Sequence, residues 1–597
     1  MPTYLPGIIE RSFLGKIGGA SPPQALAGLL SPSADPAVSR WMGRNGTSPE
    51  AVAKDAWAML KLLSSISFAV ALCVGLMAGL AALSFLALPL ILFPIIVATH
   101  FSNRPARCAR EEEADLLRHG PDAIGSMMMS MGLSPSLESA VVFSASVNHD
   151  ALGRRLADAA WSVLVRTSPD MQTALLDLAS SLSQANDGLR QALHLLLAST
   201  YEPTKEGAQR ILDKANDLVL TAFRDTAERY IASLSAPVMV LFSLGILLPV
   251  MMFSVVPLLS LSSALPVGGM SGVPSSSFPV GALGFLLVVV VPLATLFYSR
   301  SVLGRNPIAA PPHLDLGTDR TSRLFLCVWL ISLGLLIAFS FPLRSPYAFL
   351  LLAGLPPCIF LVRRTLSEHR RASCARKEEA CFITGLYQLG NRLSTGAGLE
   401  RSLREASASS QGDAFSRWAD KVLMQAKLGK RGVHELLLSD PELERIDPVV
   451  AGAYSTMAKC ALRDPLSSGQ MTVGLAKNLS DVRALETTTE EKLRGVVDMM
   501  RATSLMFAPI VLGITGGLFS LTGIVDPGAQ VSVELVTVIT GVYVLELALV
   551  VSYFTTFLMG ARSWSEVGYQ FGVRAPVAIL VFTAISLCAR TGFSRLL

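Results

Sequence analysis

The chain has little charge for its length. Only 16% of its 597 residues are Asp, Glu, Lys or Arg, whereas 51% are hydrophobic, and the mean hydropathy is +0.50. These values are too apolar for a soluble protein of this size, so we expect an integral membrane protein. The net charge of +5 is small, and basic cytoplasmic loops account for it. No basic patch with interleaved aromatic residues occurs, so nucleic acid is not an expected partner.

The sequence also lacks the motifs of common chemistries. It has no GxxxxGK[ST] loop for a nucleotide, no HExxH metal pair and no GxSxG nucleophile. The seven histidines are scattered, and the eight cysteines include no CxxC pair. Cys374 and Cys381, with His369 nearby, are short of the four ligands that zinc needs. We therefore expect no catalytic site, no metal and no cofactor. With no early apolar stretch, no cleavable signal peptide is expected either.

What the sequence does contain is an internal repeat. The stretches 111–141 and 377–403 each begin with acidic residues and continue with apolar residues at helical spacing. Each then turns at a Gly, Ser or Thr cluster and restarts with a Leu-Glu pair. The glycines of the two turns are Gly132 and Gly396, and the pairs are Leu137-Glu138 and Leu399-Glu400. Both stretches lie between pairs of hydrophobic spans, which indicates two copies of one unit.

The expected fold is an all-α polytopic membrane protein with about nine transmembrane helices and two duplicated cytosolic α-helical bundle domains. Along the chain we expect a cytoplasmic N-terminal arm (1–57), a transmembrane hairpin (58–100), a first cytosolic helical domain (101–232), a second hairpin (233–300), a cytosolic linker (301–322), a third hairpin (323–362), a second cytosolic helical domain (363–503), a fourth hairpin (504–559) and a C-terminal segment with a last span (560–597). Arginines directly after the first and third hairpins place both polar domains in the cytoplasm. Nine spans put the C-terminus outside, whereas Arg590 and Arg595 favour the inside.

Several local signals define helix ends and contacts. Ser48-Pro49-Glu50 predicts a helix start, Ser168-Pro169-Asp170 predicts a capped start, and residues 201–204 predict a boundary. Three prolines, at 237, 249 and 257, predict a kink in the span 233–261. The spacing of Gly513 and Gly517 is a GxxxG pattern, which allows a second helix to approach closely.

Two sets of charged residues are candidates for function. Glu546 is the one carboxylate deep in an apolar span. It has either a structural role, as a hydrogen-bonded or protonated side chain inside the helix bundle, or a functional one. A second set recurs at corresponding places in the two polar domains and forms either a docking surface or ordinary solvated helix faces. This set comprises Glu112, Glu113, Arg166, Glu378, Glu379, Lys427, Lys430 and Arg431.

The acidic starts, the turn with its Leu-Glu pair and the alternation of hairpins with helical domains resemble the type II secretion system F-domain family. Its members are the inner-membrane platform proteins of type II secretion, type IV pili and tight-adherence pili. The double-length arrangement looks most like the archaeal branch, which includes the archaellum assembly protein J and tight-adherence C-like proteins. The resemblance covers about residues 105–260 and 366–525.

This resemblance implies a non-enzymatic platform in the cell membrane. Such a platform contacts a hexameric secretion ATPase through its cytosolic domains. It also binds pilin-like or archaellin subunits in the membrane lipid and helps to extract them for assembly into a filament. It also implies a homodimer or small oligomer. The recurring charged residues would then be the ATPase docking surface. The alternative is a polytopic solute transporter with duplicated halves, in which Glu546 would line the pathway.

Overall fold

The computed structural model is helical throughout the residues that it describes. These are residues 36–44, 48–78, 94–95, 98–99, 101–133, 136–148, 150–182, 186–253, 284, 286–304, 345–429, 431–438, 440–462, 464–525, 533–561 and 563–596. No strand occurs within these ranges. The expected all-α class is therefore confirmed.

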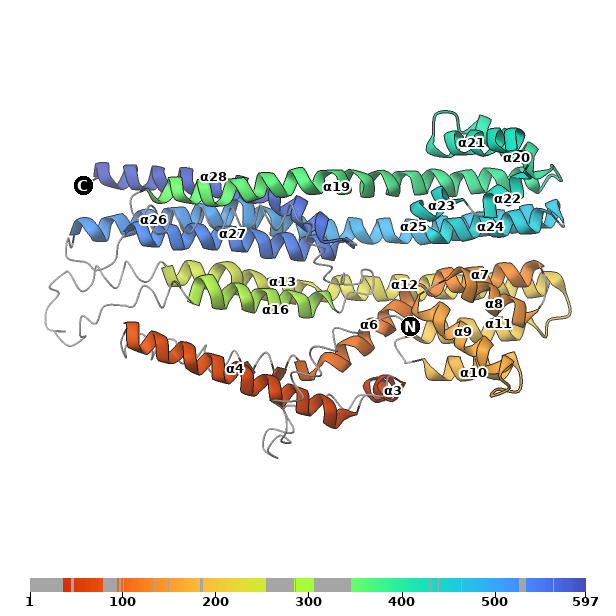
Figure 1. Ribbon diagram of the computed structural model, residues 1–597, viewed down its shortest axis with the longest axis horizontal. Coiled ribbons are helices and arrows are strands. Elements are labelled where there is room, and N and C mark those ends of the chain that lie inside the picture. The colour runs from red at the N-terminus through yellow and green to blue at the C-terminus, as the bar shows by residue number, and fades with distance from the viewer. Residues whose placement is uncertain are drawn as a thin grey trace. The chain divides into compact units, whose positions relative to one another are not determined.

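The chain forms two compact units, which we describe one at a time (Figure 1). The apolar unit consists of Met1–Glu111, Ser233–Leu366 and Arg494–Leu597. The polar unit consists of Glu112–Ala232 and Ser367–Leu493.

The apolar unit contains the hydrophobic helices. They are α3 (Pro36–Arg44), α4 (Pro49–Ala78), the start of α6 (Arg104–Arg118), α13 (Ser235–Phe242), the π-helical segments η2 (Ser243–Leu247) and η3 (Leu286–Val290), α16 (Val291–Leu303), the start of α19 (Pro346–Leu393), the π-helical segment η4 (Thr503–Phe507), α26 (Ala508–Val525), α27 (Val533–Leu558) and α28 (Trp564–Leu596). Helices α26, α27 and α28 pack against one another, and α16 packs against α27. A Cβ atom on Gly517 would lie 2.5 Å from that of Ala589, so the GxxxG pattern is where α26 and α28 meet.

Six described helices are long and apolar enough to cross a membrane. They are Glu206–Phe253, Leu286–Leu303, Pro346–Leu393, Pro465–Phe519, Val533–Leu558 and Trp564–Gly592. Each matches one of the nine expected spans. Of the other three, the first span of the hairpin 323–362 lies outside the described residues, and the two spans of the hairpin 58–100 are described only as far as α4 and a few later residues. The span expected to be kinked contains η2, and Pro257 lies outside the described residues.

Three of these helical runs join polar to apolar sequence; two are unbroken, and the third has one turn residue, Leu234, just before α13. The run Glu206–Phe253 has 48 residues, Pro346–Leu393 has 48 and Pro465–Phe519 has 55. The domain boundaries expected at 363 and 503 therefore fall inside continuous helices, whereas the one expected at 233 falls beside the turn residue Leu234. A change of polarity along a chain does not end a helix, because only the loss of backbone hydrogen bonds or a capping residue does.

The first half of the polar unit has one hydrophobic core. Its helices are α7 (Gly120–Leu133), α8 (Leu137–Val147), α9 (Ala151–Leu164), α10 (Met171–Ser181), α11 (Asp187–Ser199) and α12 (Lys205–Ser233). Ile124, Met127 and Leu152 are among its buried residues. The expected cap is confirmed, since the Asp170 side chain accepts a hydrogen bond from the Thr173 amide at 2.8 Å. The expected boundary at 201–204 is confirmed by the gap between α11 and α12.

The second half has its own core around four aromatic side chains. Its helices are the end of α19, α20 (Leu399–Ser409), α21 (Ala414–Gly429), α22 (Val433–Leu438), α23 (Pro441–Ile446), α24 (Pro448–Ala461) and α25 (Pro465–Ala502). Ring centroids of Phe382, Phe415, Trp418 and Tyr454 lie 5.2 to 6.4 Å apart. The Trp418 indole donates to Asp440 at 2.6 Å, so its polar edge is satisfied as well.

Candidate functional site

Two of the four acidic residues of the expected docking surface form ion pairs within the fold. Glu112 pairs with Arg155 at 3.0 Å, and the buried Glu379 pairs with Arg483. The Glu113 carbonyl accepts a hydrogen bond from the Asn186 side chain at 3.3 Å. Glu378 is half-buried. Reversing the charges of Glu112 or Glu379 would therefore disturb the fold before it disturbed any docking.

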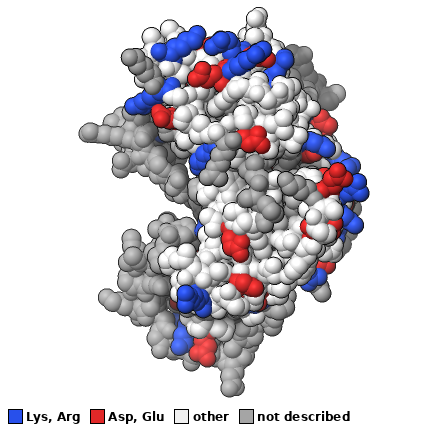
Figure 2. Space-filling view, turned by 90° about the vertical axis from the view of Figure 1, so that its right-hand side faces the viewer, with Lys and Arg blue, Asp and Glu red and all other residues white. Residues whose placement is uncertain are grey.

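The basic residues of that expected surface differ in their surroundings from the acidic ones. Arg166, Lys427 and Arg431 are exposed, and Lys430 lies outside the described residues. Arg166 follows the end of α9, whereas Lys427 lies in the last turn of α21, so the two are not at matching positions of their helices. Figure 2 looks onto an end of the polar unit, and its Lys and Arg side chains gather at the top, where Figure 1 has α20 and α21.

Arg166 is held in the left-handed backbone region, with φ at 61°. Glycine usually occupies this place after a helix, because a side chain there costs free energy. We expect Arg166→Gly to stabilise the polar unit by about 1 kcal/mol. Thermal unfolding of the purified chain, followed by circular dichroism in detergent, measures this. Arg166→Lys keeps the side-chain charge and should leave the melting temperature unchanged; an equal shift in both variants would contradict the backbone explanation.

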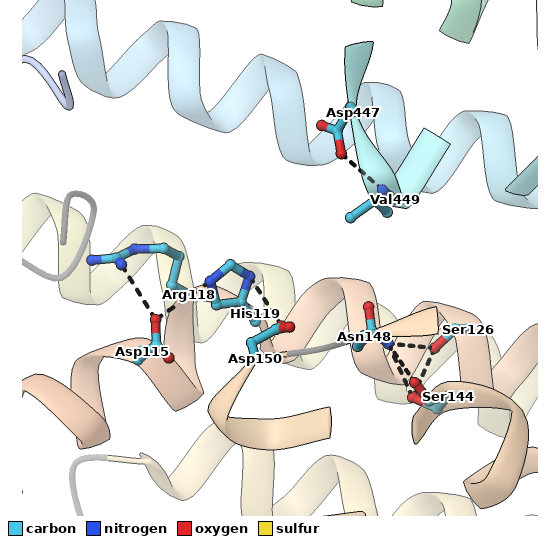
Figure 3. Close-up of polar contacts among 9 residues, drawn as sticks. All are labelled: Asp115, Arg118, His119, Ser126, Ser144, Asn148, Asp150, Asp447 and Val449. Atoms are coloured by element: carbon cyan, nitrogen blue, oxygen red, sulfur yellow. Dashed lines mark hydrogen bonds and ion pairs between the residues drawn. The ribbon is translucent and has the colours of Figure 1, made fainter. Parts of the chain in front are cut away.

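The polar cluster of the first half centres on His119. Its Nδ1 lies 3.2 Å from an Asp150 oxygen and its Nε2 lies 3.4 Å from an Asp115 oxygen, which also pairs with Arg118 at 3.4 Å (Figure 3). Burial disfavours a charged imidazole, but the hydrogen bond to Asp115 and the surrounding carboxylates outweigh it and raise the pKa of His119. Each ring nitrogen faces a carboxylate, which leaves neither nitrogen open to a substrate. The arrangement is that of a structural ion cluster.

A second cluster of polar side chains lies where α7, α8 and α9 meet. The Asn148 side chain donates to Ser126 at 3.1 Å and to the Ser144 carbonyl at 3.1 Å, and the two serine hydroxyls lie 2.8 Å apart (Figure 3). All three residues are buried. A Cβ atom on Gly153 would lie 1.8 Å from the Asn148 carbonyl oxygen, so α9 can start here only with glycine at that place.

The two halves of the polar unit meet along this cluster. The Asn478 side chain, on α25, donates to the Pro121 carbonyl at 3.4 Å, and a Cβ on Gly125 would clash with it at 2.0 Å. Lys492 and Glu228 form a second link across the halves at 2.7 Å. A small cavity lies at the first contact. Its walls are Asp122, Ser126, Phe143 and Asn148 from one half and Val449, Gly452, Ala453, Leu475, Asn478 and Leu479 from the other.

Asp122 is the titratable group of this cavity wall. Although the residue keeps part of its surface exposed, its carboxyl group is enclosed, and burial raises its pKa to about 7. His119 opposes this rise, whereas the carboxylates of Asp447, Glu486 and Asp150 add to it. Asp447 is held across from it at the start of α24, where it accepts from the Val449 amide at 2.8 Å (Figure 3). A titratable carboxyl group thus lies at the contact between the halves.

Glu546 lies on α27 in the apolar unit. One of its carboxyl oxygens is buried and has no hydrogen-bond partner. One turn earlier, the Tyr543 hydroxyl donates to the Gly245 carbonyl, which belongs to η2. A π-helical turn frees backbone groups from regular pairing, and such turns are frequent at functional sites. The expected intramembrane candidate thus lies beside an irregular helix segment.

Chemical signatures are few in the described part of the chain. No group of three or more His, Cys, Asp or Glu is arranged there to hold a metal ion. Sequence reasoning missed His119, Asp122, Asn148 and Arg483. Only Asn148 had a signal, as a polar residue directly after a helix of apolar periodicity. The partners of the others come from distant parts of the sequence.

Comparisons with family models, curated proteins and solved structures returned no match to this chain.

Proposed function

We propose that this protein is the membrane platform of a type IV pilus-like, archaellum or type II secretion-like assembly machine. The platform couples a cytosolic hexameric ATPase to the assembly of pilin-like subunits, and it is not itself an enzyme. Its polar unit lies in the cytoplasm. The observation that carries this proposal is that a similar series of helices occurs twice in the polar unit. In both occurrences the series is joined to a long helix that also has an apolar stretch long enough to span a membrane.

The repeat extends over the order of helices in the polar unit. Helices α8, α9, α10, α11 and α12 are followed in the second half by α20, α21, α22, α24 and α25, with α23 as an insertion. Helices α11 and α24 bury the same i, i+3, i+4, i+7, i+8 positions. These are Leu189, Ala192, Leu193, Leu196 and Leu197 in α11, and Val450, Ala453, Tyr454, Met457 and Ala458 in α24. Duplicated helical domains are what the F-domain resemblance implies.

The repeat also includes the long helices. In the first half, α12 and α13 lead into the π-helical segment η2, and in the second half α25 leads into the π-helical segment η4. Both runs continue into apolar helix. Because a helix is stiff over this length, force on its polar part reaches its apolar part through the backbone. A platform that converts a cytosolic stroke into movement in the membrane needs such a connection.

A pull-down tests the proposal. The tagged full chain is extracted from its native membranes in mild detergent, and the recovered proteins are identified by mass spectrometry. We expect a secretion-type ATPase and pilin-like proteins, and filaments should vanish from cells without the protein. An unrelated polytopic protein with the same tag is the control. Unchanged filaments in the deletion strain would overturn the proposal.

A solute transporter is the second candidate, and the unpaired oxygen of Glu546 favours it. Intramembrane carboxylates of transporters bind protons or cations and are sensitive to conservative replacement. On the platform proposal, we expect Glu546→Gln to preserve filament assembly, because the amide keeps the shape and can satisfy the same surroundings. Filaments counted by electron microscopy measure this. Loss of filaments at normal protein abundance would give Glu546 a function, and solute-dependent thermal stabilisation lost in the variant would favour the transporter.

A further inference from the structure

The cavity between the two halves of the polar unit is lined by oxygen atoms that lack a hydrogen-bond donor. Within the described residues, the Asp122 carboxyl group accepts no hydrogen bond. The side-chain oxygen of Asn478 is buried and has no partner. Asn148 donates to the two serines beside it through its amide nitrogen, and Figure 3 shows its oxygen pointing away from both. The hydroxyl group of Ser126 donates within its own half. Three acceptors thus line one cavity.

Negative charge predominates around this cavity. The charged neighbours that act on Asp122 include three carboxylates, which are Asp447, Glu486 and Asp150, and one histidine, His119. His119 is already shared between two carboxylates, and the guanidinium of Arg483 is shared among three. The charge of the Asp122 carboxylate therefore has no cation of its own in the described part of the chain. An uncompensated charge in such an enclosed place is costly unless a counter-charge joins it.

The size of the cavity limits what can bind there. It has room for about one particle of the size of a water molecule. Since a water molecule carries two protons, it cannot donate to three acceptors at once, and it brings no charge. Carboxylate and amide oxygens are the ligands of hard cations, but Ca²⁺ takes about six to eight of them and Mg²⁺ keeps several of its waters. One carboxylate with two neutral oxygens in so small a space instead suits a cation of single charge.

We propose that this cavity binds one monovalent cation, such as Na⁺, K⁺ or ammonium, through oxygen atoms of Asp122, Asn148 and Asn478. Asp122 and Asn148 belong to the first half of the polar unit and Asn478 to the second, so the bound ion links the halves. Amide groups supply two of the three ligands, and a search for clustered His, Cys, Asp and Glu therefore does not reveal the site. The inference goes beyond the proposed function, because it concerns an ion held inside the polar unit.

Equilibrium dialysis of the purified full chain in detergent tests this inference directly. The probes are radioactive Na⁺ and Rb⁺, the latter in place of K⁺, with unlabelled ammonium as a competitor, in choline buffer at about pH 8. We expect one ion to bind per chain. Asp122→Asn should weaken its binding on the order of a hundredfold, because the cation loses its one anionic ligand. Asp177→Asn, an exposed change on α10, is the matched control and should bind the ion as the native chain does.

Thermal unfolding in different salts measures whether the ion stabilises the fold. Chlorides of Na⁺, K⁺ and ammonium are compared with choline chloride at equal ionic strength. Above its Kd, the bound cation should raise the melting temperature of the native chain by about 4 °C for each tenfold increase in concentration. The control Asp177→Asn should show the same rise and Asp122→Asn should show none. In choline chloride the native chain should be the less stable of the native chain and Asp122→Asn, and a saturating cation should narrow that difference.

Three outcomes would overturn the proposal. If no probe binds and all salts give the same melting temperature, the cavity holds a water molecule and no ion. If Asp122→Asn binds the ion as tightly as the native chain, the ion binds elsewhere. If Ca²⁺ or Mg²⁺ stabilises the native chain and the monovalent cations do not, the charge of the ligand is wrong. The comparison of salts on the native chain needs no variant, and none of these results depends on the pull-down that tests the proposed function.

Discussion

Replacing Arg483 by alanine should destabilise the polar unit by roughly 3 kcal/mol. Arg483 lies on α25 and pairs with Glu379 of α19, with Asp447 at 3.0 Å and with Glu486 at 2.5 Å. Glu379 and Asp447 are only 7% and 9% exposed. Removing the guanidinium takes the positive charge away from two buried carboxylates, and breaking a buried pair costs more than making it gains. Because the Arg483 side chain is itself 33% exposed, we expect the lower end of the range for buried pairs.

The measurement is thermal unfolding of the full chain in detergent. Arg401→Ala is the matched control, since Arg401 pairs with Glu405 on the surface and its loss should change nothing measurable. Adding Glu379→Gln to Arg483→Ala should restore part of the loss, because one unpaired charge is then removed. Equal melting temperatures for Arg483→Ala and the control would show that the cluster does not hold α19, α24 and α25 together.

Raising the pH from about 5 to about 8 should weaken the polar unit, and Asp122→Asn should remove most of that dependence. Burial raises the pKa of Asp122 to about 7, so the folded chain keeps a proton that the unfolded chain has lost. Its stabilising contribution is complete below the ordinary pKa of 3.8, falls as the pH rises and is lost above about pH 7. The difference between the two pKa values corresponds to roughly 4 kcal/mol at most.

His119 acts in the same direction. Burial lowers its pKa, but the hydrogen bond to Asp115 and the charges of Asp150 and Asp115 raise it above its ordinary value. Its contribution is therefore complete below that ordinary value and is lost as the pH rises through the folded-state pKa. Asp115 has a lowered pKa, so its contribution is lost only in acid, as the pH falls below the ordinary pKa of 3.8.

Unfolding in urea at several pH values tests this prediction. Asp122→Asn should be more stable than the native chain at about pH 8, by roughly 3 kcal/mol, and should have the flatter pH profile. Asp177→Asn, an exposed change on α10, is the control and should leave the profile unchanged. Parallel profiles for the native chain and Asp122→Asn would show that this carboxyl group is not what titrates. If the prediction holds, the contact between the halves responds to proton binding.

The secondary structure could be predicted well because its causes are local. Apolar residues at helical spacing, and side chains such as Asp170 that cap the next turn, act within a few neighbours along the chain. The same holds for the six spans, since a run of apolar residues long enough to cross a membrane can form little but a helix. The ends of the long helices were harder to predict, because a change from apolar to polar residues does not break a helix.

The ion clusters depended on the tertiary structure. Arg483 reaches Glu379 from far along the chain, and Asp122 acquires its altered pKa only when α7 and α24 enclose it. Sequence alone could not distinguish Glu379 as a buried partner from Glu378 as a half-buried neighbour, because their chemistry is the same. Local order thus follows from neighbouring residues, whereas burial, charge partners and exposed faces follow from how the helices pack.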